Sequence, residues 1–245
     1  MSLQDVVVCA HFGCAFVPAL VERLSDAERR ALLAVDARAF RADADRRHRA
    51  VVAIADELPV SIAVAGLDAV YALFDDEGVF GRVVAGADVL AVAFADALVG
   101  TVGDAARIEG AVARARRRRR VRRVIARTDG VEAVRVSEGA LAAFDALRAR
   151  LGTDVVAAVC SGARLTTAPG NSNESYVLAT RDPAGGVALG ACSSALGALL
   201  VGLDGVDDIA GATALARSLG CDTDAEALEL LRELAADGLV SLPAV

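Results

Sequence analysis

The sequence contains no lysine, no tryptophan and only two histidines, and aromatic residues make up just 4% of it. Alanine and valine dominate its 55% hydrophobic content, so we expect an interior of many small helix contacts with few large aromatic anchors. His11 and His48 lie far apart in the sequence, which argues against a metal site built from several imidazoles. The sequence also lacks a P-loop and a G-x-S-x-G elbow. These absences argue against catalysis by this chain alone.

The five cysteines are an odd number and are scattered along the chain. No basic flank precedes the first apolar run, so the N-terminus does not resemble an export signal, and we expect reduced thiols in a cytoplasmic protein. Cys9, His11 and Cys14 are close enough in sequence to form a cysteine or metal centre, although small buried side chains are the simpler interpretation. The longest uncharged run, 183–203, approaches membrane length, but its glycines and serines indicate strand, turn and helix.

The net charge of −7 argues against a general nucleic-acid coat and against a membrane-surface protein. Residues 114–123 contain eight Arg and no acid, which leaves 18 Arg against 33 acids, a balance of −15, in the rest of the chain. A run of this kind can contact phosphates, but it has no interleaved aromatic residues and no second basic element. We therefore interpret it as a solvated connecting helix that acidic surface neutralises.

Apolar spacing in the first half predicts a bundle of five or six helices. A segment over 4–17 fits either a strand or a helix, and helices are predicted at 18–24, 26–40, 43–58, 61–74 and 87–98. Pro59 is expected to end the helix over 43–58. Where two of these helices meet, Arg and Asp alternate, which suggests either a self-paired solvated corner or a docking surface. The candidate partner-binding residues are Asp36, Arg38, Phe40, Arg41, Asp43 and Arg46.

From residue 131 the pattern changes. The runs at 131–136 and 154–160 resemble strands around a helix over 138–151, and a turn, Arg-Asp-Pro-Ala-Gly-Gly, separates strands at 175–180 and 187–190. Helices follow at 193–203, 207–219 and 223–236, and 239–242 is expected to return as a strand. The predicted fold class is α+β, with a helical bundle over 1–125 and a small winged-helix-like module over 126–245.

The charged corner also carries a family resemblance. The run D-A-R-A-F-R-A-D-x-x-R-R-x-R, followed by E-L-P-V-S, resembles the partner subunits of multinuclear non-heme iron-dependent oxidases that modify ribosomally made peptides. It covers roughly the first hundred residues. The same motifs are similar to related helical domains once described as DNA-binding.

The last seventy residues resemble the peptide-recognition element of ribosomal-peptide biosynthesis. The resemblance rests on V-A-L-G-A-C-S-S-A-L-G-A-L-L, L-D-G-V-D-D-I and L-x-L-L-R-E-L-A-A-D-G-L-V. It implies that an extended leader peptide adds to the hairpin edge and places side chains beside the last helix. The candidate peptide-binding residues are Val187, Leu189, Leu228, Glu229, Leu231 and Glu233, and the alternative is that the apolar ones belong to the core.

Together, these resemblances imply a non-catalytic partner protein that binds a precursor leader and presents it to an iron-dependent oxidase. The iron is then held by the oxidase, and this chain needs no cofactor. The main alternative is a winged-helix transcriptional regulator. From residue 171 onward, however, eleven acids face three Arg, a balance of −8, and such a module would repel DNA phosphates.

Overall fold

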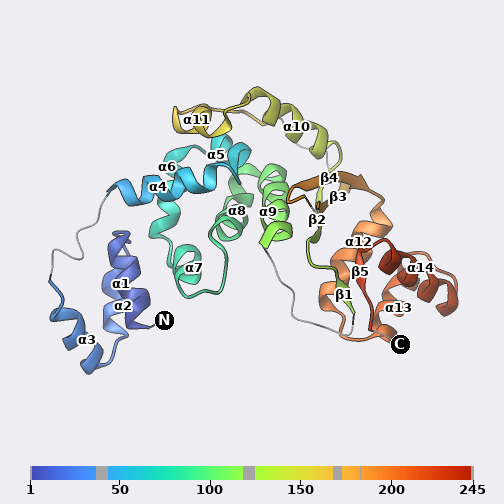
Figure 1. The fold of residues 1–245 in the computed structure, drawn as a ribbon, viewed down its shortest axis with the longest axis horizontal. Coiled ribbons are helices and arrows are strands. Elements are labelled where there is room, and N and C mark those ends of the chain that lie inside the picture. The colour runs from blue at the N-terminus through green and yellow to red at the C-terminus, as the bar shows by residue number, and fades with distance from the viewer. Residues whose placement is uncertain (1, 37–43, 118–124, 168–172, 183, 244–245) are drawn as a thin grey trace. The chain divides into compact units, whose positions relative to one another are not determined.

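The computed structural model describes residues 2–36, 44–117, 125–167, 173–182 and 184–243 (Figure 1). It is a mostly helical α+β fold with small antiparallel sheets in its second half. The chain divides into two compact units, one of residues 1–109 and 146–167 and the other of residues 110–145 and 168–245. The division therefore falls within two helices, α9 (Asp104–Arg117) and α10 (Ala140–Arg150), and the expected domain boundary near residue 125 stays a prediction.

Helices account for the regular structure described before residue 118. They are α1 (Leu3–His11), α2 (Val17–Glu22), α3 (Asp26–Leu33), α4 (Ala44–Ala55), α5 (Pro59–Ala65), α6 (Leu67–Ala72), the short helical turns η2 (Leu73–Asp75) and η3 (Glu77–Gly81), α7 (Arg82–Val84), α8 (Leu90–Val102) and α9 (Asp104–Arg117). The predicted helices at 18–24 and 87–98 are confirmed as α2 and α8. The segment at 4–17, left open between strand and helix, contains α1.

Capping boxes begin two of these helices. The Ser2 hydroxyl accepts from the Asp5 amide while the Asp5 carboxylate accepts from the Ser2 amide, and Ser25 and Glu28 repeat the arrangement at α3. The helix predicted over 26–40 is too long, because α3 ends at Leu33 and residues 34–36 are not helical; residues 37–40 lie outside the described residues.

Two predicted helix boundaries change around Pro59. The helix predicted over 43–58 ends at Ala55, and Pro59 begins α5 instead of simply ending α4. Proline suits the first turn of a helix because its missing amide has no intrahelical partner there. The single helix predicted over 61–74 is wrong, because Gly66 adopts φ 84° and divides it into α5 and α6.

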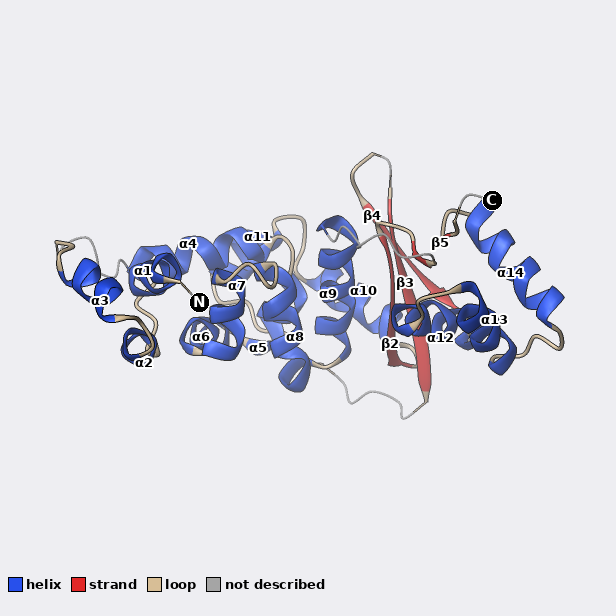
Figure 2. Cartoon of the chain, turned by 90° about the horizontal axis from the view of Figure 1, so that it is seen from below, coloured by secondary structure: helices blue, strands red, loops and turns tan. Residues whose placement is uncertain are grey.

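The second half contains two sheets and a group of helices. Its elements are β1 (Ala126–Arg127), β2 (Val131–Ser137), α10 (Ala140–Arg150), α11 (Val155–Cys160), β3 (Glu174–Arg181), β4 (Val187–Cys192), α12 (Ser194–Gly202), η4 (Leu203–Gly205), α13 (Ile209–Ser218), α14 (Asp224–Ala236) and β5 (Val240–Ser241). One sheet has the order β2-β3-β4, antiparallel throughout, and β1 pairs with β5 in the other (Figure 2). The predicted hairpin and the three helices after it are confirmed.

The prediction of a strand at 154–160 is wrong. Asp154 caps a helix there by accepting from the Ala157 amide at 2.9 Å, and α11 packs on α4 and α5 (Figure 1). A short apolar run has no periodicity that separates a buried strand from a buried helix, so the sequence pattern could not decide between them.

Each unit has its own buried core. In the first, the Phe74 ring centroid lies 5.0 Å from that of Phe80 and 5.2 Å from that of Phe94. Phe12 stacks on Phe74, so this aromatic cluster contains four of the seven Phe. In the second, leucines of α12 and α14 form the main cluster with Ile125 and Val240. No helix in the described parts of the chain is long and apolar enough to cross a membrane.

Candidate functional site

The β4 strand forms an edge of the three-stranded sheet. It pairs with β3 through Tyr176–Cys192 to Arg181–Val187, and among the described residues no strand pairs with its outer side. None of its residues is fully buried. An exposed edge offers unpaired backbone amides and carbonyls to an added strand.

The two faces of this sheet are covered differently. On one face, Val187 and Leu189 pack with Val134 and Ala179 against alanines of the α9 C-terminal half, Ala111 and Ala115 among them. On the other face, α12 packs over β2 and β3. The sheet is therefore sandwiched between α9 and α12 along its inner strands.

On the sheet face that α12 covers, the residues of β4 are small. Ala188 and Gly190 alternate with Val187 and Leu189, so they point to the opposite face, and both are exposed. A Cβ added at Gly190 would meet no atom within 4 Å. Closer to the sheet centre the same face is tight, because Gly197 of α12 lies directly over Tyr176 of β3. The edge strand therefore has open space beside Ala188 and Gly190 on this face.

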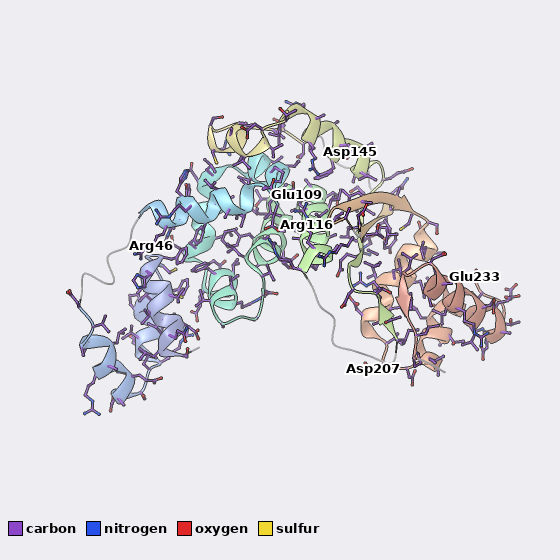
Figure 3. The ribbon with its side chains drawn as sticks, viewed as in Figure 1. Arg46, Glu109, Arg116, Asp145, Asp207 and Glu233 are labelled. Atoms are coloured by element: carbon purple, nitrogen blue, oxygen red, sulfur yellow. The ribbon has the colours of Figure 1, made fainter. Side chains whose placement is uncertain are left out.

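The predicted peptide-binding residues do not form one cluster. Val187 and Leu189 face α9, whereas Leu231 is 1% exposed in the core that α12, α13 and α14 share. Leu228 is half-buried. The carboxylates of Glu229 and Glu233 are exposed on α14, and Figure 3 labels Glu233. The interpretation that some of these residues are core is therefore confirmed for Leu231.

Most of the predicted partner-binding residues, Arg38, Phe40, Arg41 and Asp43, lie outside the described residues. Asp36 is described and exposed, three residues after α3 ends. Arg46 is half-buried near the start of α4 (Figure 3), where its Nη1 donates to the His11 carbonyl at 3.0 Å and lies 2.6 Å from His11 Nδ1. Because an Arg nitrogen only donates, His11 Nδ1 is the acceptor of this pair.

Arg47 is not among the candidate partner-binding residues, but it links α4 to the turn after α1. It donates to the carbonyls of Phe12 and Gly13, each at 2.7 Å, and forms a two-point ion pair with Asp75 at 2.8 and 2.9 Å. Its guanidinium also lies 5.6 Å from the Phe74 ring centroid. The ion pair raises the pKa of Arg47 and lowers that of Asp75.

The segment with Cys9, His11 and Cys14 brings the two thiols together, but it does not place the three side chains as a set of metal ligands. Cys9 and Cys14 are buried and their side chains interact with each other, while His11 is held by Arg46. In the described part of the chain, no three His, Cys, Asp or Glu side chains lie close enough to hold a metal ion.

A buried ion cluster connects β1, β2 and η4. The Arg127 side chain, 4% exposed, pairs with Glu132 at 3.1 Å and with both carboxylate oxygens of Asp204. It also donates to the Ala133 carbonyl at 3.4 Å. This cluster fixes the start of the sheet relative to the end of α12, and Asp204, whose side chain is 41% exposed, forms its solvent side.

A second buried charge, Glu109 of α9, binds the start of α5 (Figure 3). Its two carboxylate oxygens accept from the amides of Val60 and Ser61, each at 2.9 Å. Burial raises the pKa of Glu109 to about 7, although the polar groups of Ser61, the Val60 amide and the charge of Arg148 act to lower it.

Comparisons of this chain with protein-family models, with curated proteins and with solved structures found no match.

Proposed function

We propose that this chain is a non-catalytic partner protein that binds the leader of a ribosomally made precursor peptide and presents it to a multinuclear non-heme iron-dependent oxidase. The identity of the oxidase and the chemistry of the modification come from the sequence resemblance. The described residues support the peptide-binding half of the proposal.

The single observation that carries the proposal is the exposed edge of β4. An extended leader adds there as a fourth strand, so that its backbone amides and carbonyls pair with those of β4. Leader side chains that point to the α12 face then lie beside Ala188 and Gly190, where the chain itself contributes almost no side chain. An apolar leader residue fills that space and is removed from water.

The elements around the edge support a winged-helix-like module. Three antiparallel strands, β2 to β4, are followed directly by three helices, α12 to α14, as in the peptide-recognition element. The described α14 side chains explain why we assign peptide and not DNA. Asp224, Glu226, Glu229 and Glu233 are exposed there, whereas Arg232 is the one Arg of this helix and Arg217 of α13 pairs with Asp224, so the net charge is negative and repels phosphates.

In this proposal the helices of the N-terminal half dock the oxidase, and the oxidase supplies every iron ligand. Asp36 and Arg46 mark the described borders of the charged segment that we assign to the docking surface. The two contacts of Arg46 with His11 hold its guanidinium at the border of this charged segment.

The experiment compares two glycine substitutions in the same unit. Gly190→Trp places a large side chain in the open space on β4, whereas Gly205→Trp places one on η4, where a new Cβ also meets nothing within 4 Å. Affinity for the precursor peptide encoded beside this gene is measured by fluorescence anisotropy. We expect Gly190→Trp to weaken binding about tenfold or more, which corresponds to roughly 1.4 kcal/mol.

Gly205→Trp should bind within about twofold of the unchanged protein. Circular dichroism and thermal melting establish that both variants are folded. If both variants and the unchanged chain bind the precursor equally well, the β4 edge is not the leader site. A precursor that none of the three proteins binds contradicts leader binding as a whole.

A further inference from the structure

The turn between α1 and α2 brings two cysteines into contact. Cys9 lies in the last turns of α1 and Cys14 lies three residues after the helix ends, and their exposed fractions are 0% and 4%. The Cys14 amide donates to the Cys9 carbonyl at 3.1 Å, and Gly13 reverses the chain with φ 63°. The side chains of Cys9 and Cys14 also interact with each other. Adjacent backbones and neighbouring side chains are the arrangement from which a disulfide can form.

The surroundings give the two thiols different roles. The interaction with the Cys14 side chain lowers the pKa of Cys9, and this effect exceeds the opposing effects of burial and of the Asp5 and Glu77 charges. The same interaction and burial raise the pKa of Cys14. Cys9 is therefore the sulfur that ionises first, and a thiolate is the form that reacts with an oxidant.

We propose that Cys9 and Cys14 are a redox modification site that hydrogen peroxide converts to an intramolecular disulfide. The Cys9 thiolate attacks one peroxide oxygen, the O–O bond breaks, and the hydroxide that leaves takes up a proton to become water. Cys9 is then a sulfenic acid. Cys14 loses its proton, its sulfur attacks the Cys9 sulfur, and the S–O bond breaks with release of a second water. Two thiols and one peroxide thus give one disulfide and two waters.

The disulfide would fix the turn that accepts hydrogen bonds from α4. The carbonyls of His11, Phe12 and Gly13 lie inside the loop that the bond closes, and they accept hydrogen bonds from Arg46 and Arg47. Closing the loop restricts the unfolded chain, so the oxidised protein is more resistant to heat. Oxidation thereby stabilises the segment that borders the proposed docking surface, although the reaction itself does not depend on the proposed function.

The experiment uses the full chain and one tryptic peptide. Cleavage after Arg23 releases residues 1–23, which contain Cys9 and Cys14 and no other cysteine. The folded protein is treated with hydrogen peroxide, and catalase removes the excess. The protein is then unfolded in urea with iodoacetamide, which blocks every free thiol, digested and analysed by mass spectrometry. We expect the peptide to lose two hydrogens and to carry no alkyl group, and dithiothreitol before blocking should restore two. Oxidation of Met1 adds one oxygen and is separable by mass.

Cys14→Ser should abolish the loss of two hydrogens, and Cys221→Ser, at a half-buried cysteine of the other unit, should leave it unchanged. The oxidised protein should melt about 5 °C higher than the reduced one. The inference is overturned if the peptide keeps two alkylatable thiols while Cys160 or Cys221 is oxidised. It is also overturned if Cys9 and Cys14 proceed to sulfinic or sulfonic acids, or if they pair with cysteines of other molecules.

Discussion

Replacing Glu109 by Gln should remove a pH dependence from the free energy of unfolding. Glu109 is 2% exposed, and its carboxylate accepts hydrogen bonds from two α5 amides, each at 2.9 Å. The side chain reaches α5 from a helix 48 residues further along the chain. Glutamine keeps the size and one acceptor oxygen but cannot ionise.

The sign follows from the direction of the shift. In the unfolded chain Glu109 titrates near 4.5, and in the folded chain its pKa is about 7. Between these values the folded protein holds a proton that the unfolded chain releases, so stability falls as pH rises through this window. Well above pH 7 Glu109 is ionised in both the folded and the unfolded chain, and stability no longer changes with its titration. From these two pKa values, linkage gives a decrease of about 2–3 kcal/mol between pH 5 and pH 8.

The assay is urea unfolding followed by circular dichroism at several pH values from 5 to 8. The free energy of the Glu109→Gln variant is subtracted from that of the unchanged protein, so that all other titrating groups cancel. Glu22→Gln, at an exposed glutamate of the same unit, controls for the removal of a carboxylate as such. A difference that stays constant within about 0.5 kcal/mol from pH 5 to pH 8 would refute the reasoning.

Two further predictions concern the C-terminal unit. Arg127→Met should destabilise the protein by about 3–5 kcal/mol, because it leaves a buried carboxylate without its cation, and urea unfolding measures the loss. Gly197→Ala should lower the melting temperature by several degrees, because the new Cβ would lie 2.1 Å from the Tyr176 ring, whereas Gly205→Ala should change it little. Equal melting temperatures for the two glycine variants would contradict the close packing of α12 on β3.

Much of the C-terminal half could be predicted from local signals. The turn between β3 and β4 begins at Asp182, whose carboxylate accepts from the Ala184 amide at 2.7 Å, and Gly185 takes φ 98°. Thr223 and Glu226 form a capping box at the start of α14. Such signals act over three or four residues, so they are readable without the fold.

The candidate site was only partly predictable for the same reason. The sequence indicates a strand over 187–190 and a helix over 223–236, but it does not indicate which face of the sheet or helix each side chain lies on. Val187 and Leu189 proved to pack under α9, far back in the sequence, while Leu231 joined the core with α12. Alternation along a strand defines two faces. Only the elements that cover the sheet determine which face is buried and by what.

The sequence by itself determined the helical first half, the hairpin and the three helices after it. Only the tertiary structure decided that Val155–Cys160 is a helix, that Glu109 binds the start of α5 and that Arg47 joins α4 to the turn after α1. Caps and turns are satisfied by neighbours in the chain. A buried charge is satisfied by whichever polar group the fold brings to it, across 35 residues for Arg47 and 49 for Glu109, and no local pattern records that partner.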